Sequence, residues 1–334
     1  MAEPTALFAL MPEVFDEVFT AEALGRLKRV ARLPDCAPHG DLGTARARAA
    51  LADAEILVTG WGCPRLDTQT LDAAPNLRAV IHAAGSVKYH LDDEVFDRGI
   101  AVSSAAEANV RPVAEYTVAM CVLAAKRAFG LARAYAAGEN VHDYVAGRSP
   151  SLRHAAVGII GASRIGRMVI GMLGAYDVDI AVYDPYLSDQ EAQALGVHRV
   201  ELDQLCATSD VVSIHAPELP ETINMIGEAQ LSMMRQGTVL INTARGALVD
   251  TAALTRHCQA GRIDAVLDVT EPEPLPSDHP LLHLPNVVVT PHLAGAKGRE
   301  VSRLGDFAID EVERFVAGRE LLGRVTAAEL IRTA

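Results

Sequence analysis

Short apolar runs alternate with helix-like segments along the second half of the chain. From Ala155 onward these runs read AAVGII, DIAVY, DVVSIH, TVLIN, IDAVLDV and NVVVT. Because each run is apolar at consecutive positions, it is typical of a strand buried on both faces, as in a parallel sheet with helices on both sides. The pattern predicts a doubly wound α/β domain.

The N-terminal third of the chain repeats this pattern on a smaller scale. Its apolar runs read LFALMP, AEILVTGW, LRAVIHAAG and GIAVSSA, with helical stretches between them. We therefore expect an α/β chain of two Rossmann- or flavodoxin-like lobes, each with a doubly wound parallel sheet, and a cleft between the lobes. The larger domain should span residues 108–298, and a smaller, discontinuous domain should combine residues 1–107 with 299–334.

Two helices are expected where the predicted domains join. Residues 107–138 carry apolar side chains at helical spacing for nearly their whole length, with Pro112 near the start, where a first-turn proline is tolerated. This segment predicts one long connecting helix, and the polar, aperiodic residues 139–154 predict a loop or arm. Residues 299–318 are apolar along one face, which indicates an amphipathic helix that returns to the first lobe.

The length of the chain indicates how many domains it has, and its charge indicates which partners it can bind. The 334 residues suffice for two domains of roughly 150 residues each. A formal net charge of −13 repels phosphate backbones and anionic lipid surfaces, so neither nucleic acid nor a membrane is expected as a partner. No apolar run approaches the roughly 20 residues that span a bilayer, and the N-terminal segment lacks the basic region of a signal peptide.

The number and spacing of the cysteines indicate the redox state of the compartment in which the protein works. There are five of them, widely scattered and without C-x-x-C spacing: Cys36, Cys63, Cys121, Cys206 and Cys258. This pattern favours a reducing cytoplasm, and it predicts no structural zinc or other metal site.

The stretch VGIIGASRIGR, residues 157–167, is typical of a strand that turns into a helix at a dinucleotide phosphate. Gly161 would permit the turn, and Gly166 would let the helix pack closely on the strand. Ser163 stands where the G-x-G-x-x-G pattern has its second glycine, and it would add bulk but also a hydroxyl donor. Taken alone, the stretch is equally compatible with an ordinary strand-to-helix turn.

An acidic residue at the end of the next apolar run supports a cofactor site. The run DIAVYDP contains Asp184, 18 residues beyond Gly166. A carboxylate at this distance accepts hydrogen bonds from the adenosine ribose hydroxyls and repels a 2′-phosphate. The combination predicts an NAD site and disfavours NADP. The alternative is that Asp184 only shapes the turn before Pro185.

Three stretches place ionisable residues just after predicted strands, where open α/β sheets bind ligands. INTARGALVD contains Arg245, LDVTEPEPLP contains Glu273, and VVVTPHLAG contains His292. Reduction of a 2-keto acid needs a cation for the substrate and an acid that protonates the forming alkoxide. One histidine among 11 is more often a surface residue, and an arginine before glycine is often solvated. The ordered trio is what favours catalysis.

Together with YDPY and SIHAPELPET, these motifs resemble those of the D-isomer-specific 2-hydroxyacid dehydrogenases, from about Asn109 to Gly298. The resemblance implies that Arg245 binds the substrate, Glu273 orients the histidine, and His292 is the general acid/base. It also implies NAD as the cofactor. Residues 108–298 would then be the NAD-binding Rossmann domain, and the discontinuous domain would bind the substrate.

The same resemblance implies a set of cofactor contacts. The choice of Glu273 over Glu271 follows the family pattern D-V-x-x-x-E-P, which starts at Asp268. The alternative for Pro217 and Thr222 is that they only shape a loop, and Asp268 could equally cap a strand end. The expected cofactor-binding residues are Gly161, Ser163, Arg164, Ile165, Gly166, Asp184, His215, Pro217, Thr222, Thr243, Ala244, Asp268 and Gly295.

The substrate loop of the first lobe departs from the family pattern G-x-G-x-D-N. Here the sequence is AAGSVKYH, in which Gly85 is kept while Val87 and Tyr89 replace the second glycine and the aspartate. We expect the backbone N–H groups of Ser86 and Val87 to hold the substrate carboxylate. Lys88 would add a cation for a larger or doubly anionic substrate, unless it is simply an exposed loop lysine.

These features predict a cytoplasmic, NAD-dependent oxidoreductase for a small-molecule 2-keto acid/D-2-hydroxy acid pair. Trp61 would cover the substrate or simply pack in the core.

The formate-oxidising branch of the family lacks the carboxylate partner of its histidine, so Glu273 argues against formate oxidation. An alternative from another class is an NAD-sensing corepressor on the same fold. The resemblance also implies a homodimer formed through the cofactor domain, with the helix after Asn109 and its arm as the surface, unless this helix packs only within its own chain.

Overall fold

The computed structural model of the chain describes residues 3–141 and 151–330. The chain divides into two compact units, one made of Met1–Asn109 with Ala296–Ala334 and the other of Val110–Gly295. We refer to them as the smaller and the larger unit. Within the described residues, no helix is both long enough and apolar enough to cross a membrane.

The smaller unit is a sheet between two layers of helices. Its elements, in chain order, are β1 (Ala6–Ala9), η1 (Pro12–Val14), α1 (Phe15–Val18), α2 (Ala21–Leu27), α3 (Ala45–Leu51), β2 (Ile56–Thr59), α4 (Thr68–Asp72), β3 (Ala79–His82), α5 (Glu94–Asp97), β4 (Ala101–Ser104), η4 (Gly298–Glu300), α14 (Ser302–Val316), β12 (Arg324–Val325) and α15 (Ala327–Leu330).

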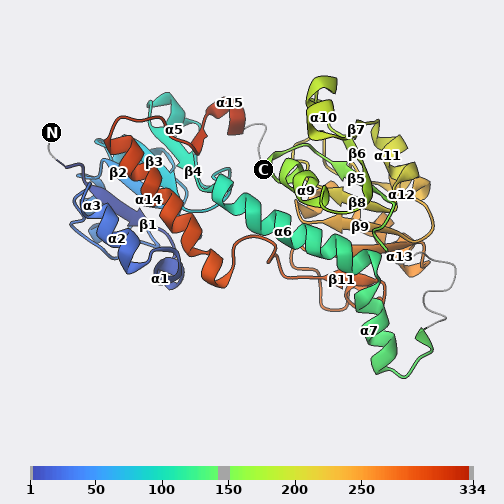
Figure 1. Cartoon of the computed structure of the whole chain (residues 1–334). Coiled ribbons are helices and arrows are strands. Elements are labelled where there is room, and N and C mark those ends of the chain that lie inside the picture. The colour runs from blue at the N-terminus through green and yellow to red at the C-terminus, as the bar shows by residue number, and fades with distance from the viewer. Residues whose placement is uncertain (1–2, 142–150, 331–334) are drawn as a thin grey trace. The chain divides into compact units, whose positions relative to one another are not determined.

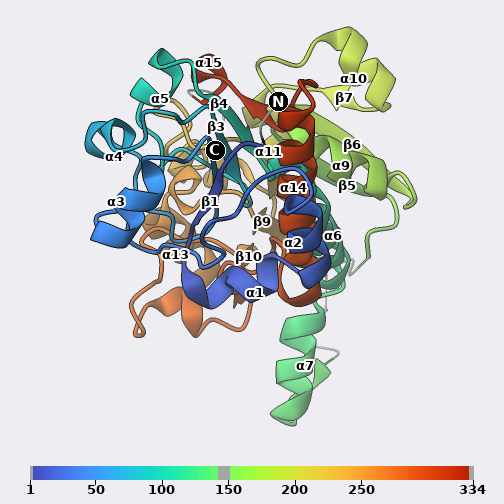
Figure 2. The ribbon, with the colours of Figure 1, turned by 90° about the vertical axis from the view of Figure 1, so that its left-hand side faces the viewer.

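The five strands of this unit have the order β1-β2-β3-β4-β12. β1 to β4 are parallel, with Ala6 opposite Ile56 and Ile56 opposite Ala79, whereas β12 is antiparallel to β4. An isolated parallel bridge joins Thr5 to Arg32 beside β1, where a flavodoxin-like sheet has its outer strand. Helices α1, α2 and α14 cover one face of the sheet, and α3, α4 and α5 cover the other (Figure 2).

The larger unit has more strands and the same layering. Its elements are α6 (Ala106–Ala125), whose first residues belong to the smaller unit, α7 (Ala128–Ala136), β5 (Ala155–Ile160), α9 (Arg164–Leu173), β6 (Val178–Tyr183), α10 (Asp189–Leu195), β7 (His198–Arg199), α11 (Leu202–Thr208), β8 (Val211–Ile214), α12 (Glu228–Met233), β9 (Thr238–Asn242), η2 (Gly246–Leu248), α13 (Thr251–Gln259), β10 (Ile263–Leu267), η3 (Pro280–Leu282) and β11 (Val287–Val289).

All seven strands of the larger unit are parallel, in the order β11-β10-β9-β8-β5-β6-β7. α6 and α9 pack on one face, and α11, α12 and α13 pack on the other (Figure 1). The predicted doubly wound α/β fold is confirmed, and all six apolar runs form strands. The order reverses between β5 and β8, which is the switch point where such sheets bind ligands.

The prediction of one long connecting helix is wrong, because the helix is broken into α6 and α7. The break lies at Arg127, whose φ of 56° is left-handed. The buried guanidinium of Arg127 lies 2.6 Å from a carboxylate oxygen of Asp264 and donates to the carbonyl oxygen of Gly237. The helical conformation therefore ends at Arg127, the residue whose side chain forms the buried ion pair with Asp264.

Three other features were expected near the junctions. Pro112 lies inside α6 rather than in its first turn, because the helix already begins at Ala106. Of the expected arm, residues 142–150 lie outside the described part of the chain. The amphipathic helix expected after Gly298 is α14, which buries Leu304 and other apolar residues in the smaller unit.

Candidate active site

The glycine loop joins β5 to α9 at the switch point of the larger sheet. Gly161 has a φ of 97°, and a Cβ there would lie 2.7 Å from the backbone nitrogen of Ala216. A Cβ at Gly166 would overlap the carbonyl oxygen of Gly161. Only glycine fits these two positions, because the obstructing atoms are backbone atoms. The tight turn places the N–H groups of the first turn of α9 directly after the strand, which is the arrangement that binds a phosphate.

Ser163 is the N-cap of α9. Its φ is −63° and its ψ is 177°, and its Oγ accepts a hydrogen bond from the N–H of Gly166 at 3.3 Å. Because this backbone is extended with a negative φ, the position does not require glycine. In the following turn Arg164 is exposed, and Ile165 packs against the apolar cluster around β5. A serine at the second position is therefore compatible with the phosphate-binding turn.

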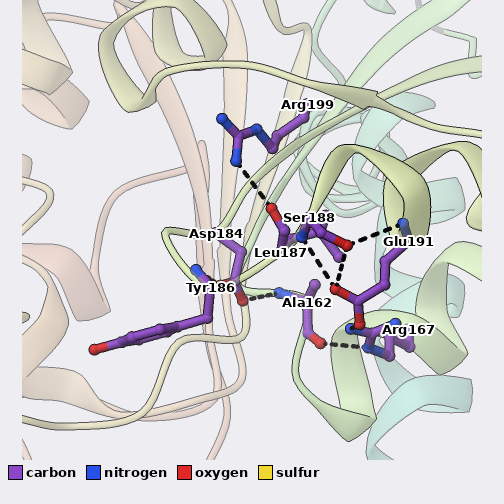
Figure 3. A network of polar contacts seen from close by, with 8 residues as sticks. All are labelled: Ala162, Arg167, Asp184, Tyr186, Leu187, Ser188, Glu191 and Arg199. Carbon is purple, nitrogen blue, oxygen red and sulfur yellow. Dashed lines mark hydrogen bonds and ion pairs between the residues drawn. The ribbon is translucent and has the colours of Figure 1, made fainter.

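Asp184 follows β6 and holds the glycine loop, as Figure 3 shows. Its Oδ2 accepts from the N–H of Ala162 at 2.7 Å, and its Oδ1 accepts from the N–H of Tyr186 at 2.8 Å. Each carboxylate oxygen has a second lone pair, so Asp184 can hold the loop and still accept from ribose hydroxyls. The geometry is compatible with both sequence interpretations, the turn residue and the ribose acceptor.

Arg167 and Glu191 extend this network on the other side of Ala162. Arg167 Nε donates to the carbonyl oxygen of Ala162 at 2.9 Å, and its Nη2 lies 2.9 Å from Glu191 Oε1 (Figure 3). Hydrogen bonds from the backbone N–H and hydroxyl of Ser188, together with Arg167, lower the pKa of Glu191 to about 2. Neither Arg167 nor Glu191 was predicted as part of the site, although the S-x-x-E spacing of a capping box at Ser188–Glu191 was the available signal.

The residues expected beside the adenosine are held by contacts within their own segment. His215 is buried after β8, with its Nε2 3.0 Å from Ser213 Oγ. Burial lowers the pKa of His215 to about 4, so its ring is neutral at neutral pH. The Thr222 hydroxyl donates to the carbonyl oxygen of Pro217 at 2.7 Å and accepts from the N–H of Leu219 at 2.8 Å. Thr222 and Pro217 therefore shape a loop, whatever else they bind.

His292 and Glu273 meet at the C-terminal edge of the larger sheet. Nδ1 of His292 lies 2.7 Å from Oε1 of Glu273, and the two side chains are 53% and 42% exposed. His292 has a left-handed φ of 50°, which is uncommon for a residue with a Cβ and is often found at functional sites. With Nδ1 engaged by the carboxylate, Nε2 is the ring nitrogen that can exchange a proton with a substrate.

Arg245 lies half-buried in the loop after β9. Its Nη1 donates to the carbonyl oxygen of Ala244 at 2.6 Å. A Cβ at Gly246 would overlap the carbonyl group of Thr270, so the arginine loop packs directly against the segment that leads to Glu273. The structure thus brings His292 and Glu273 into contact. It also places the loop of Arg245 against the segment that carries Glu273.

Asp268 organises the loop that carries His292. Its buried carboxylate accepts from Thr290 Oγ1 at 2.6 Å and from the N–H groups of Leu293 and Ala294 at 2.9 and 2.8 Å. Its carbonyl oxygen accepts from the N–H of His292 at 3.0 Å. These bonds make Asp268 the cap of the strand end, and a contact with the cofactor stays a prediction.

Two further expected cofactor residues also lie at this edge. Thr243 is buried after β9, and its Oγ1 is 2.9 Å from Oγ1 of Thr117 on α6. Thr117 gives its own proton to the carbonyl oxygen of Val113, so Thr243 is the donor to Thr117. Gly295 is the last residue of the larger unit.

The expected substrate residues belong to the smaller unit. Val87 is buried in the apolar cluster on the α3–α5 face of the sheet, so its side chain serves packing. Ser86 Oγ accepts from the N–H of Lys88 at 3.3 Å. A Cβ at Gly85 would make only an ordinary contact, so sterics do not require glycine there. Trp61 is half-buried and packs against two apolar clusters.

A buried histidine at the end of β3 was missed by the sequence analysis. Nδ1 of His82 lies 2.8 Å from Thr59 Oγ1, and its ring centroid is 5.3 Å from that of His90. Burial lowers the pKa of His82 to about 3, so the ring is neutral at neutral pH. No sequence motif marks His82, because its contact with Thr59 and its burial both depend on the fold.

Comparisons with known proteins find a family model and relatives that match this chain. A family model described as D-isomer specific 2-hydroxyacid dehydrogenase, NAD binding domain, matches residues 118–294. D-3-phosphoglycerate dehydrogenase of Archaeoglobus fulgidus is 34% identical over 255 residues, which are 76% of this chain and 48% of that protein. Glyoxylate reductase of Thermofilum pendens is 36% identical over 253 residues, 73% of each chain. The chain therefore spans about half the length of the first relative and about three quarters of the second.

The fold is shared with solved structures over nearly the whole chain. D-mandelate dehydrogenase of Rhodotorula graminis, in its apo form, superposes with a TM-score of 0.83 at 22% identity. The alignment covers 97% of this chain and 98% of that chain. At this identity the likeness shows the fold alone.

Proposed function

Because the chain belongs to the D-isomer-specific 2-hydroxyacid dehydrogenase family and carries its NAD-binding domain, we propose that it interconverts a 2-keto acid and a D-2-hydroxy acid. The observation that carries the proposal is the 2.7 Å contact between His292 Nδ1 and Glu273 Oε1. It provides a positioned acid–base pair at the sheet edge where doubly wound folds bind their ligands. NAD, when bound, supplies or accepts the hydride.

Three side chains would handle the substrate. In the reductive direction, His292 would give a proton from Nε2 to the keto oxygen while the carbonyl carbon receives the hydride, and in oxidation it would take this proton back. Glu273 would hold the ring and stabilise its charged form. Arg245 would turn from its own backbone to the substrate carboxylate, because its planar guanidinium matches two carboxylate oxygens.

The glycine loop fits a dinucleotide. A Cβ at Gly161 or Gly166 would collide with backbone atoms, so the turn stays tight. The first turn of α9 then presents its N–H groups to a phosphate. We assign Asp184 to the ribose hydroxyls, which favours NAD over NADP. The other cofactor contacts in the proposal are Ser163, Arg164, Ile165, His215, Pro217, Thr222, Thr243, Ala244, Asp268 and Gly295.

We assign substrate binding to the smaller unit. The proposed contacts there are Gly85, Ser86, Val87, Lys88 and Trp61. Ser86 and Val87 would act through their N–H groups, which is consistent with the buried side chain of Val87. Two relatives of this chain are a D-3-phosphoglycerate dehydrogenase and a glyoxylate reductase, which supports a small 2-keto acid as substrate.

A cytoplasmic homodimer completes the proposal. All five cysteines are free thiols, and four of them are buried, which suits a reducing compartment. Leu123 of α6 and Tyr135 of α7 are exposed, which supports a dimer surface on these helices. No observation favours the corepressor alternative.

The decisive experiment is a screen of NADH and NADPH oxidation. The purified protein is offered glyoxylate, hydroxypyruvate, pyruvate, phosphohydroxypyruvate and bulkier 2-keto acids, and absorbance at the dihydronicotinamide band is followed. We expect turnover of at least one acid with NADH and a D-configured product. Absence of turnover with every acid, at millimolar substrate and with bound NADH demonstrated by fluorescence, would contradict the proposal.

His292→Ala is the matched test of mechanism. It should lower kcat by at least about 100-fold, because general acid–base catalysis contributes about 10²–10⁴. The dissociation constant of NADH should stay within about twofold of the wild type. His198→Ala, at an exposed histidine of β7, is the control and should leave both constants unchanged. Equal turnover in the two variants would remove His292 from the mechanism.

A further inference from the structure

A chain of hydrogen bonds runs from α6 to the loop that carries His292. Tyr116 Oη lies 2.8 Å from Thr290 Oγ1, and Thr290 Oγ1 donates to Asp268 Oδ1 at 2.6 Å. The same carboxylate accepts from the N–H groups of Leu293 and Ala294. All five residues belong to the larger unit, so these contacts lie within one compact body.

The protons of this chain point in one direction. A threonine hydroxyl has a single proton, and Thr290 gives it to the carboxylate of Asp268, so Tyr116 must be the donor to Thr290. Burial raises the pKa of Tyr116, so the phenol keeps its proton throughout the physiological range. Each donor therefore polarises the next, from the phenol through the threonine to the carboxylate.

The backbone of His292 depends on the same two residues. Its N–H lies 3.0 Å from the carbonyl oxygen of Asp268 and 2.9 Å from that of Thr290. Its left-handed φ of 50° is a conformation that persists only where the surroundings enforce it. Any loosening of Asp268 or Thr290 is therefore transmitted to the imidazole and to its contact with Glu273.

We propose that Tyr116 is a positioning residue for His292, acting from α6 through Thr290 and Asp268. The inference rests on the proposed function, in which His292 transfers the proton. Tyr116 would not touch the substrate; its phenol would keep the loop after β11 in the one arrangement that presents the imidazole. The neighbouring Thr117, bonded to Thr243 after β9, anchors the same stretch of α6 to the sheet edge.

Amide hydrogen exchange tests the relay without any need for turnover. In Tyr116→Phe, the amides of Leu293 and Ala294 should exchange at least about fivefold faster, since one hydrogen bond of the network is lost. The amides of β5 should keep their wild-type rates. Tyr176→Phe, at a tyrosine between α9 and β6 that is 42% exposed, is the matched control. Unchanged exchange at both amides in Tyr116→Phe would overturn the inference.

Kinetics test whether the relay positions the imidazole. With the best 2-keto acid, Tyr116→Phe should lower kcat about tenfold, and the solvent isotope effect on kcat should rise as proton transfer becomes slower. A variant that merely folded less well would show fewer active sites and the wild-type isotope effect. Normal kcat and isotope effect in a variant with faster amide exchange would also overturn the inference.

Substitutions at the middle of the relay locate the effect. Thr290→Val should reproduce the losses of Tyr116→Phe, whereas Thr290→Ser should restore most of the activity. The double variant Tyr116→Phe/Thr290→Val should be no slower than Thr290→Val alone, because both changes interrupt one path. Fully multiplicative losses would overturn the relay. Absence of turnover by the wild-type protein would instead contradict the proposed function, and the exchange rates would still decide the role of Tyr116.

Discussion

At the scale of single residues, the carboxylate of Asp184 has a structural role in the glycine loop and, in the proposal, a second role in binding the ribose. It holds the N–H groups of Ala162 and Tyr186, and in the proposal it also accepts the ribose hydroxyls. Alanine at this position would remove both functions together and would leave their contributions inseparable. Asparagine removes the negative charge but keeps one acceptor oxygen, so it can still hold one of the two backbone N–H groups and preserves more of the loop than alanine does.

We expect Asp184→Asn to relax the preference for NADH over NADPH by at least about tenfold, or about 1.4 kcal/mol. The physical reason is that the asparagine no longer repels a 2′-phosphate. The measurement is the ratio of kcat/KM for the two cofactors with one 2-keto acid. Asp179→Asn, at an exposed aspartate of β6, is the control. Equal ratios in the two variants would discredit the ribose assignment.

Single residues were predictable where a motif fixes their chemistry. The pairing of His292 with Glu273 was implied by the resemblance of their motifs to the family, although the two residues are separated by 19 positions. Tyr116 was not predictable, because its partner Thr290 lies 174 residues away and only the fold brings them together. The N-cap role of Ser163 was equally hidden, since it depends on the φ and ψ of one residue.

At the scale of elements, apolar runs predict strands well because a doubly wound sheet buries both faces of its central strands. The same logic fails at helix ends. Apolar spacing continues past Ala125, yet the helix breaks at Arg127, where pairing with Asp264 is a tertiary effect without local signal. The edge strand β7 was missed for the opposite reason, because His198 and Arg199 are both exposed and carry no apolar pattern.

The buried ion pair at this break should matter far more than surface pairs do. The Arg127 and Asp264 side chains are 5% and 11% exposed, so Arg127→Met should cost about 3–5 kcal/mol by leaving a buried carboxylate uncompensated. Arg111→Met, which breaks the exposed pair with Glu115, should cost under about 1 kcal/mol. Urea unfolding measures both. A loss at Arg127 no larger than at Arg111 would refute this account.

The close packing of α9 on β5 requires a residue without a Cβ at Gly166. In Gly166→Ala, the new Cβ would overlap the carbonyl oxygen of Gly161, so helix and strand must separate. We expect a loss of at least about 2 kcal/mol in the free energy of unfolding and a weaker affinity for NADH. Calorimetric titration with NADH and urea unfolding measure the two effects.

Gly171→Ala is the control on the same helix. A Cβ there meets nothing within 4 Å, so the substitution should stabilise α9 by up to about 1 kcal/mol through its helix propensity. NADH affinity should be unchanged. If both alanine variants behaved alike, close packing at Gly166 would not be what holds the glycine loop.

At the scale of the whole molecule, each unit encloses one histidine that the fold keeps neutral. His82 in the smaller unit has a pKa of about 3, and His215 in the larger unit has a pKa of about 4, in both cases because of burial. In the unfolded chain both rings titrate near their ordinary value of about 6.5. Between these values the unfolded state binds more protons than the folded state, so stability must fall as the pH is lowered.

We therefore expect the free energy of unfolding to decrease from about pH 6.5 towards pH 4, by up to about 1.4 kcal/mol per pH unit for each histidine. Glu191 adds to the loss only in a lower window, because its pKa of about 2 lies below the ordinary carboxylate value. The fluorescence of Trp61, the only tryptophan, reports the smaller unit during urea unfolding at pH 7, 6 and 5. His82→Gln should flatten this dependence in the smaller unit, whereas His198→Gln, at an exposed position, should not. A slope that is the same in both variants would show that the ring of His82 is already solvated in the folded protein.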